Sequence, residues 1–197
     1  MSIKTTGYWL SGAMSVACLL GLSYVGIHVA EVQANEVATI KKAQEVSIVQ
    51  AQILREEKEY EYVTQHRCLA LNIYHEARSD GDLGQQAVGF VTMNRVENDK
   101  YPETICDVVY QAHVNAKGSP IINKCQFSWY CDGKSDIPND KERMHTAMLV
   151  AEHVMLSYNK IPDMTGGAIM YHAHYSNPYW SKAYERTVRI DSHIFYK

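Results

Sequence analysis

One glutamate has the type and the surroundings expected of a general acid. It is Glu76, and it lies within residues 68–78 (CLALNIYHEAR), where apolar residues recur at spacings of three and four and so predict a helix with one apolar face. Glu76 follows Ile73 by three positions and Leu69 by seven, which puts its carboxyl group at the edge of that face. There it loses contact with water, and its pKa rises towards the range that suits a proton donor. The alternative is a surface glutamate paired with Arg78, because structural ion pairs also perturb carboxylates.

The segments after this helix are expected to hold the glutamate in place. Residues 79–82 (SDGD) form a predicted turn that leads into a second helix. Asp82 is expected to cap that helix, with Gln85 at the capping-box position. Asn94 falls on the inward face of the second helix, where a buried amide needs hydrogen-bond partners. We interpret Asn94 as a residue that either orients Glu76 or bonds the backbone.

The remaining pattern predicts a mainly helical α+β domain with a small β-hairpin. A third, short helix is expected at residues 102–110 because Pro102 favours a helix start, and residues 111–124 are expected to form a loop. A longer helix is predicted after Asp140, running to about position 158. Two short segments, 168–175 and 187–190, alternate weakly and are expected to pair as the hairpin.

The N-terminal residues differ in character from this domain. Residues 8–30 carry no formal charge and are long enough to cross a bilayer as a helix. Lys4 before the segment and Glu31 after it favour an N-terminus in the cytoplasm and a domain outside. We favour a retained signal anchor over a cleaved signal peptide ending at residues 32–34, because the segment exceeds a usual signal-peptide core. A buried core helix fits this length and position less well.

A three-part organisation follows from these patterns. Residues 1–30 are the anchor or signal peptide, residues 31–63 a helical linker and residues 64–197 the domain, with Thr64 as a candidate N-cap. The linker is polar and contains neither Gly nor Pro, and as a continuous helix it would be about 45 Å long. It acts either as a stalk or as a solvated helix that packs back on the domain. The predicted location is the inner membrane with the domain outside, or the periplasm or exterior after release.

The five cysteines indicate disulfides rather than a metal site. Cys18 lies in the apolar segment, and the four others lie in the domain, where two disulfides with three possible connectivities are expected outside the cytoplasm. Cys125 and Cys131 are close enough to close a small loop, which leaves Cys68 to pair with Cys106, and we favour this connectivity. Because no C-x-x-C spacing occurs, a metal site at these cysteines is the weaker interpretation, and we predict no bound metal. No cofactor is predicted either.

The charge and the aromatic content restrict the class of ligand. The formal net charge is −3, so the chain lacks the basic footprint of a nucleic-acid-binding protein. The chain contains 14 tyrosines, and aromatic side chains suit the faces of sugar rings but also fill small cores.

Four blocks of sequence, taken in order, resemble the SleB/CwlJ-type cell wall hydrolases. They are YHEARSDGDLGQQAVGFVTMNRV (74–96), YPETICDVVYQ (101–111), CQFSWYCDG (125–133) and YHAHYSNPYW (171–180). The likeness extends from about residue 67 to residue 180, and four blocks in the same order are a specific signal where one block alone is weak.

The resemblance implies a lysozyme-like, mainly helical catalytic domain that acts on bacterial peptidoglycan. The catalytic glutamate of the family corresponds to Glu76, and members are similar to lytic transglycosylases, which cut between N-acetylmuramic acid and N-acetylglucosamine and leave a 1,6-anhydro-muramyl end. Ser79, Asp80 and Leu83 depart from the family pattern, so Asp80 is at most an assisting carboxylate with a shorter side chain. An anchor followed by a helical spacer resembles membrane-tethered phage endolysins in architecture only.

A groove for the glycan strand completes this expectation. The predicted substrate-binding residues are Arg78, Asn94, Gln126, Phe127, Ser128, Tyr171, His172 and Trp180. Gln126 and Ser128 are suited to bond acetamido groups. Phe127, Tyr171 and Trp180 are suited to stack on sugars, or alternatively to fill the core.

Three other interpretations compete with a glycan-cleaving enzyme. A zinc amidase or peptidase would use His75, His172 and His174, yet alternate residues of a strand point opposite ways, so we expect His172 towards the groove and His174 exposed. A cysteine peptidase would need Cys68 as a free thiolate, which a disulfide forbids. A non-catalytic, membrane-tethered wall-binding or lysis-accessory protein would keep the aromatic groove without needing Glu76.

Overall fold

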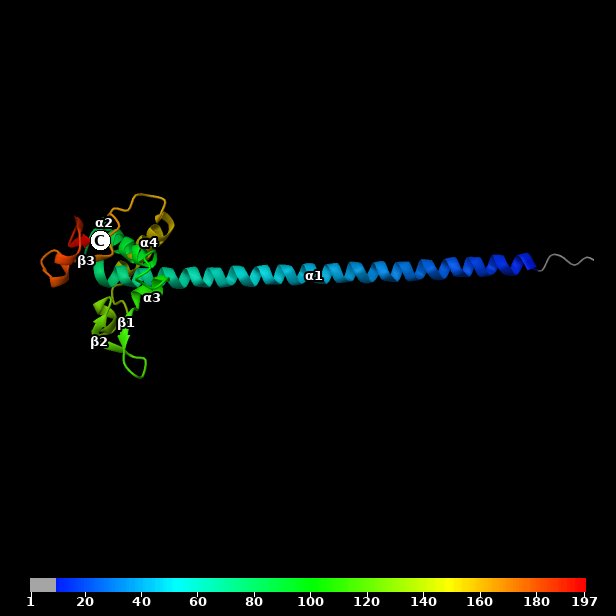
Figure 1. Cartoon of the computed structure of the whole chain (residues 1–197), viewed down its shortest axis with the longest axis horizontal. Coiled ribbons are helices and arrows are strands. Elements are labelled where there is room, and N and C mark those ends of the chain that lie inside the picture. The colour runs from blue at the N-terminus through cyan, green and yellow to red at the C-terminus, as the bar shows by residue number, and fades with distance from the viewer. Residues whose placement is uncertain (1–9) are drawn as a thin grey trace, which may run out of the picture. The chain divides into compact units, whose positions relative to one another are not determined.

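The computed structural model describes the backbone of residues 10–197 and the side chains of residues 23–197. The chain divides into two compact units, of which the second is Lys58–Lys197 (Figure 1). Most of the predicted membrane segment, residues 8–30, lies outside the described side chains. Among the residues that the structure describes, no helix combines the length and the apolar character needed to cross a membrane.

The first helix, α1, runs from Leu10 to Ala77 without a break. The predicted linker, residues 31–63, is therefore helical, as expected from the absence of Gly and Pro. Thr64 does not begin a new helix, because its hydroxyl donates to the carbonyl oxygen of Tyr60 inside α1 (2.8 Å). The side chains from position 23 to position 63 are exposed, and burial begins only near the end of the helix. Where the linker ends and the domain begins stays a prediction from the sequence.

Three further helices surround the end of α1 in the second unit. They are α2 (Asp82–Val96), α3 (Ile105–Val109) and α4 (Lys141–Ser157). The apolar face predicted for residues 68–78 is confirmed, since Leu69 and Ile73 are fully buried in the core. At Gly89 on α2 there is no side chain, so methyl groups of Ile73 and Val154 reach within 3.3 and 3.0 Å of the place where a Cβ would lie. This close approach packs α2 against both α1 and α4.

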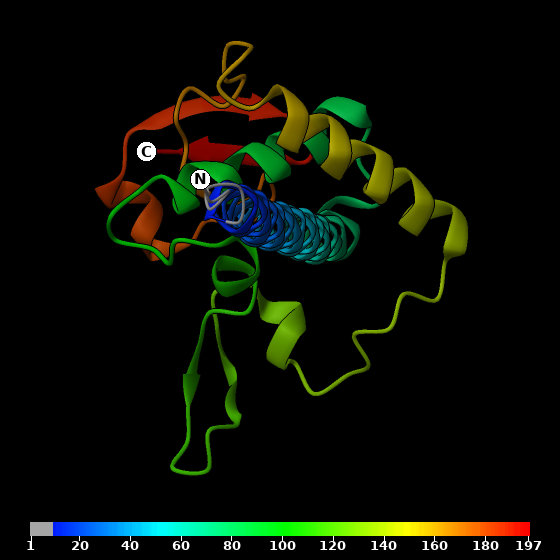
Figure 2. The ribbon, with the colours of Figure 1, turned by 90° about the vertical axis from the view of Figure 1, so that its right-hand side faces the viewer.

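Two small antiparallel sheets complete the unit (Figure 2). The first pairs β1 (Ala112–Val114) with β2 (Pro120–Cys125). The second contains β3 (Met170–Ala173), β4 (Arg186–Ile190) and β5 (His193–Tyr196) in the order β3-β5-β4. Single-turn 3-10 helices are η1 (Ser128–Cys131) and η2 (Tyr179–Ala183).

The predictions for the helices agree with the structure better than those for the strands. Asp140 caps α4 as expected, its carboxylate accepting from the backbone N–H of Arg143 (3.0 Å). The predicted loop at residues 111–124 instead contains the β1–β2 hairpin. The predicted direct pairing of the strands near 168–175 and 187–190 is wrong, because β5 lies between β3 and β4. Four residues are too few for β5 to show an alternating pattern in the sequence.

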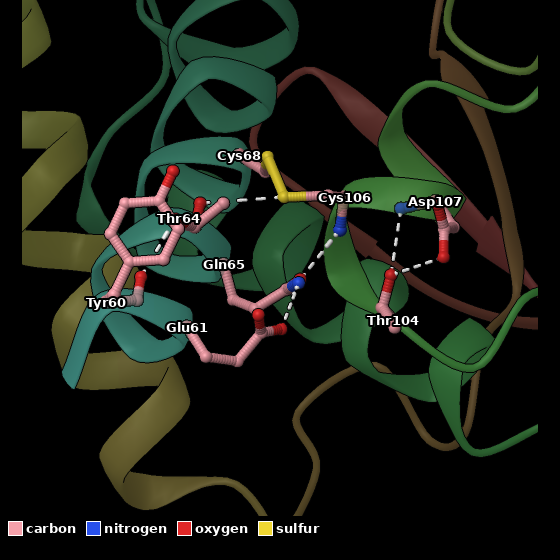
Figure 3. Close-up of a disulfide and its surroundings, with 8 residues drawn as sticks. All are labelled: Tyr60, Glu61, Thr64, Gln65, Cys68, Thr104, Cys106 and Asp107. Carbon is pink, nitrogen blue, oxygen red and sulfur yellow. Dashed lines mark hydrogen bonds between the residues drawn. A yellow bond between two sulfur atoms is a disulfide. The ribbon is translucent and has the colours of Figure 1, made fainter. Parts of the chain in front are cut away.

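Both predicted disulfides are present with the favoured connectivity. Cys68 of α1 is bonded to Cys106 of α3, and Cys125 at the end of β2 is bonded to Cys131 of η1. Figure 3 shows that the first bond lies beside Gln65, whose side-chain oxygen accepts from the backbone N–H of Cys106 (2.8 Å). The disulfide and this hydrogen bond together fix α3 to the last turns of α1.

We expect loss of the Cys68–Cys106 disulfide to lower the free energy of unfolding by about 3–4 kcal/mol, because it closes a loop with a sequence separation of 38. The Cys68→Ala/Cys106→Ala protein is compared with the wild type by urea denaturation of the oxidised full chain. The matched control is Cys125→Ala/Cys131→Ala, whose loop spans a separation of only 6 and whose loss is expected to cost about 2 kcal/mol. A larger loss from the short loop than from the long one would contradict the prediction.

Candidate active site

Glu76 lies in the last turn of α1 with its carboxyl group partly buried. The neighbouring side chains of Ile73 and Ala77 are fully buried. Tyr171 of β3 donates its hydroxyl hydrogen to Glu76 Oε2 over 3.1 Å. Burial raises the pKa of Glu76, while the Tyr171 hydrogen bond and the charge of Arg95 act in the opposite direction. The environment therefore favours a carboxyl group that holds its proton at a higher pH than a solvated glutamate does.

Tyr171 faces the glutamate with its hydroxyl and packs its ring among other aromatic residues. The ring lies edge-on to His193 at 5.1 Å and beside Phe195 at 5.7 Å between centroids. Burial raises the pKa of Tyr171 well above its usual value, so its hydroxyl stays protonated and donates. The residue was expected either to stack on a sugar or to fill the core, and its hydroxyl lies on Glu76 Oε2. That hydrogen bond leaves Oε1 as the oxygen that can carry a transferable proton.

Arg95 near the end of α2 belongs to the same cluster and was missed from the sequence. Its side chain is only 3% exposed. Nε donates to the carbonyl oxygen of Ile169 (2.8 Å), and Nη2 contacts Met170 Sδ (3.9 Å). The guanidinium lies over the rings of Phe127 (4.9 Å) and Tyr101 (5.4 Å). An arginine inside an otherwise apolar helix face is rare, and the N-R-V block was the signal that could have identified it.

Asp80, the candidate assisting carboxylate, forms hydrogen bonds with residues at the turn between β4 and β5. Its side chain is 5% exposed. Oδ1 accepts from the hydroxyl of Ser192 (2.6 Å), and Oδ2 lies 3.0 Å from Nδ1 of His193. Burial lowers the pKa of His193, against the opposing effect of Asp80, which favours a neutral imidazole that donates to the carboxylate. Both carboxylate oxygens therefore serve a structural contact.

The same turn caps the start of α2. Asp191 Oδ2 accepts from the backbone N–H of Gly84 over 3.0 Å. A Cβ at Gly84 would lie 2.6 Å from that oxygen, so the contact depends on glycine. The capping box expected from Asp82 and Gln85 does not form. The N-cap is Gly81, and the side-chain amide of Gln85 donates to the carbonyl oxygen of Asp80 (3.1 Å).

Asn94 is inward-facing as expected, but its partners are structural. Its amide nitrogen donates to Asp163 Oδ2 and to the carbonyl oxygen of Ala168, both at 2.9 Å. Its oxygen accepts from the hydroxyl of Tyr158 (3.0 Å). Asn94 thus fastens the loop before β3 to α2, and its hydrogen-bonding groups are used within the fold rather than on Glu76.

The other predicted groove residues separate into buried and accessible sets. Phe127 is 3% exposed and packs in the core under the guanidinium of Arg95, so its ring is not open to a sugar. Ser128 is exposed, and Gln126 lines a cavity of about 510 Å³ at the base of the β1–β2 hairpin. Arg78 is exposed and lines a separate cavity of about 330 Å³ on the side of α1 that carries Tyr74.

The three histidines proposed as ligands of a zinc site have different surroundings. His172 is half-buried, with Nε2 2.9 Å from the Tyr196 hydroxyl and the Trp180 ring edge-on at 5.5 Å. His174 is exposed, as expected. His75 stacks on Trp129 at 4.4 Å. Among the residues whose side chains the structure describes, no group of three His, Cys, Asp or Glu is placed to hold a metal ion.

The structure also bears on the cysteine-peptidase alternative, because the candidate nucleophile is not a free thiol. It requires Cys68 as a free thiolate, and Cys68 is disulfide-bonded to Cys106.

Comparisons with known proteins agree with the sequence blocks. The model of the Cell Wall Hydrolase family matches residues 79–196, beginning three positions after Glu76. Among solved structures, the chain is similar to the catalytic domain of the germination-specific lytic transglycosylase SleB from Bacillus anthracis, with 24% identity, a TM-score of 0.52, and coverage of 68% of this chain and 93% of that one. It is also similar to the catalytic domain of the Bacillus cereus SleB protein, with 24% identity, a TM-score of 0.50, and coverage of 68% and 89%. No curated protein gives a significant match. At this identity the structural likeness concerns the fold.

Proposed function

Because the chain belongs to the Cell Wall Hydrolase family, we propose that it degrades peptidoglycan by cleaving the glycan strand between N-acetylmuramic acid and N-acetylglucosamine, with Glu76 as its single acid and base. The observation that carries this proposal is the pairing of a partly buried Glu76 with the Tyr171 hydroxyl at 3.1 Å. A second carboxylate has no evident part, since Asp80 is held by Ser192 and His193. This arrangement supports a lytic transglycosylase better than a two-carboxylate hydrolase.

The chemistry needs two proton transfers through one carboxyl group. In the first step the O–H bond of neutral Glu76 breaks, its proton moves to O4 of the leaving N-acetylglucosamine, and the bond from that oxygen to C1 of N-acetylmuramic acid breaks. In the second step the C6 hydroxyl of the same muramic acid attacks C1, and its proton passes to the Glu76 carboxylate. The 1,6-anhydro ring closes and neutral Glu76 is restored without a water molecule.

Mass spectrometry of soluble muropeptides after digestion of purified peptidoglycan tests this proposal. We expect products with 1,6-anhydro-muramyl ends, lighter by one water than reducing ends. Reducing muramic acid ends would indicate a hydrolase and overturn the transglycosylase mechanism. Intact glycan strands with cleaved stem peptides would indicate an amidase or peptidase, which sensitivity to a chelator would identify as metal-dependent. Binding to peptidoglycan without any product would favour the wall-binding alternative.

We further propose that the domain works outside the cytoplasm. The two disulfides support this location, because such bonds persist in oxidising compartments and are rare in the cytosol. Retention in the inner membrane by residues 8–30 belongs to the same proposal and rests on the sequence alone.

A further inference from the structure

We propose that Arg95 is a positioning residue of this site, because its buried guanidinium fixes the strand that carries Tyr171 and stabilises the carboxylate that Glu76 becomes after it gives up its proton. This inference rests on the function proposed for Glu76, and it adds a residue to which no catalytic part was assigned. The evidence comes from three features of Arg95: its contacts with Ile169 and Met170, the lack of a salt bridge to it among the described side chains, and its electrostatic effect on Glu76.

The bonds of Arg95 reach the residues that immediately precede Tyr171. Nε donates to the carbonyl oxygen of Ile169 at 2.8 Å, and Nη2 contacts the sulfur of Met170 at 3.9 Å. Tyr171 follows directly, and its hydroxyl donates to Glu76 Oε2. The guanidinium therefore sets the start of β3, and β3 in turn sets the hydroxyl that holds the glutamate.

Burying the positive charge of Arg95 costs free energy, because the guanidinium loses its hydration. The side chain is 3% exposed, and Nη1 has no hydrogen-bond partner in the described part of the chain. Among the residues with described side chains, Arg95 forms no salt bridge with a carboxylate. An apolar side chain of similar size would pack against the Phe127 and Tyr101 rings without the loss of hydration that a buried cation suffers. The two ring faces and the carbonyl oxygen of Ile169 offset part of this cost, but no carboxylate among the described side chains forms a salt bridge with the cation.

The positive charge of Arg95 affects the pKa of Glu76. Tyr171 of β3 donates its hydroxyl hydrogen to the Glu76 carboxyl group. The charge of the Arg95 cation on α2 opposes the rise of the Glu76 pKa that burial produces. His193 contacts the ring of Tyr171 edge-on and bonds Asp80. In a site with little water, a fixed cation acts beyond hydrogen-bonding distance. Burial keeps the proton on Glu76 before reaction, and Arg95 eases its departure when the leaving oxygen takes it.

A titration of Glu76 itself tests the inference without any substrate. The full chain is labelled with glutamate carrying carbon-13 at the side-chain carboxyl, and the Glu76 signal is identified by its absence from Glu76→Gln. We expect the pKa of Glu76 to rise in Arg95→Met and to stay unchanged in Arg95→Lys, which keeps the charge. If Arg95→Met does not fold, Arg95→Gln removes the charge and keeps a donor group near Ile169. An unchanged Glu76 pKa in a folded neutral variant would overturn the inference.

A pH–rate profile of glycan cleavage gives the second readout. Loss of the charge is expected to move the alkaline limb to higher pH, because Glu76 then keeps its proton longer, and to lower kcat by about tenfold. That loss is smaller than the ~10²–10³-fold typical of a donor that touches the developing charge. Arg95→Lys should restore the limb. A lower rate with an unmoved limb would mean a purely structural role and would reject the inference.

Absence of glycan cleavage by the wild type, together with a shifted Glu76 pKa in the neutral variant, would reject the proposed function and leave the link between Arg95 and Glu76 intact.

Discussion

Glu76→Gln is expected to lower the release of soluble muropeptides from purified peptidoglycan by at least about 10²–10⁴-fold, the usual contribution of a general acid. The amide keeps the shape of the side chain and an oxygen that accepts from the Tyr171 hydroxyl, but it has no transferable proton. In the one-carboxylate mechanism both proton transfers pass through Glu76, so both are lost. The exposed Glu152 on α4 provides the matched control, and Glu152→Gln should keep wild-type activity.

Although its activity should fall, Glu76→Gln should be at least as stable as the wild type at pH 7. The folded pKa of Glu76 is raised, chiefly by burial, so its contribution to stability is fully present below the unfolded value of about 4.5 and is lost as the pH rises through the folded pKa. Gln does not ionise and avoids this loss. We therefore expect thermal melting of Glu76→Gln at pH 7 to occur at or above the wild-type temperature, with the relative gain smaller at pH 4. A well-folded Glu76→Gln protein with near-normal activity would end the proposed mechanism.

Local patterns in the sequence identified the helices of the domain but not all of their ends, since the helix predicted from Pro102 begins at Ile105 with Thr104 as its N-cap. The spacing of Leu69, Ile73 and Glu76 placed the carboxyl group correctly at the edge of a buried face, because a helix converts sequence spacing directly into direction. Asp140 identified the start of α4 by the same kind of local signal. Four cysteines in a chain expected outside the cytoplasm were enough for the disulfides, since closing the shortest loop left one remaining pair.

The partners of the polar residues could not be obtained in this way, because they lie far along the chain. Tyr171 meets Glu76 across 95 residues, and Ser192 meets Asp80 across 112. No spacing rule connects such positions, and β5, which brings Ser192 and His193 to Asp80, was too short to recognise. Asp80 therefore looked like a spare carboxylate near the catalytic candidate. The sequence also could not show that Arg95 is buried against Phe127, since an isolated arginine is ordinarily exposed.

Variants of Asp80 should distinguish a structural role of this residue from a catalytic one. Asp80→Ala leaves the hydroxyl of Ser192 and the imidazole of His193 without their acceptor in a nearly dry site. Each buried donor without a partner costs about 1–3 kcal/mol, so we expect the free energy of unfolding at pH 7 to fall by about 3–5 kcal/mol. Asp80→Asn keeps one acceptor oxygen and should lose less. Urea denaturation measures both, and Asp99→Asn, at an exposed position, is the control.

The pH dependence distinguishes the contribution of His193 from that of the carboxylate. Burial lowers the folded pKa of His193, so the stability from its neutral form is present above the unfolded value of about 6.5 and is lost as the pH falls through the folded pKa. We expect the wild type to lose stability over that range, and Asp80→Asn to lose it more steeply, because the Asp80 charge no longer offsets the cost of protonating the imidazole. An identical pH dependence in the two proteins would contradict the Asp80–His193 contact.

The activity of Asp80→Asn then decides between the two classes of enzyme. It is measured as muropeptide release at a temperature where the variant is fully folded by circular dichroism. In a transglycosylase the C6 hydroxyl takes the place of water, so activity should stay within about tenfold of the wild type. In a two-carboxylate hydrolase the loss should approach that of Glu76→Gln, because the second carboxylate would activate water or attack the sugar. A folded Asp80→Asn protein as inactive as Glu76→Gln would show that the contacts to Ser192 and His193 are not the whole of what Asp80 does.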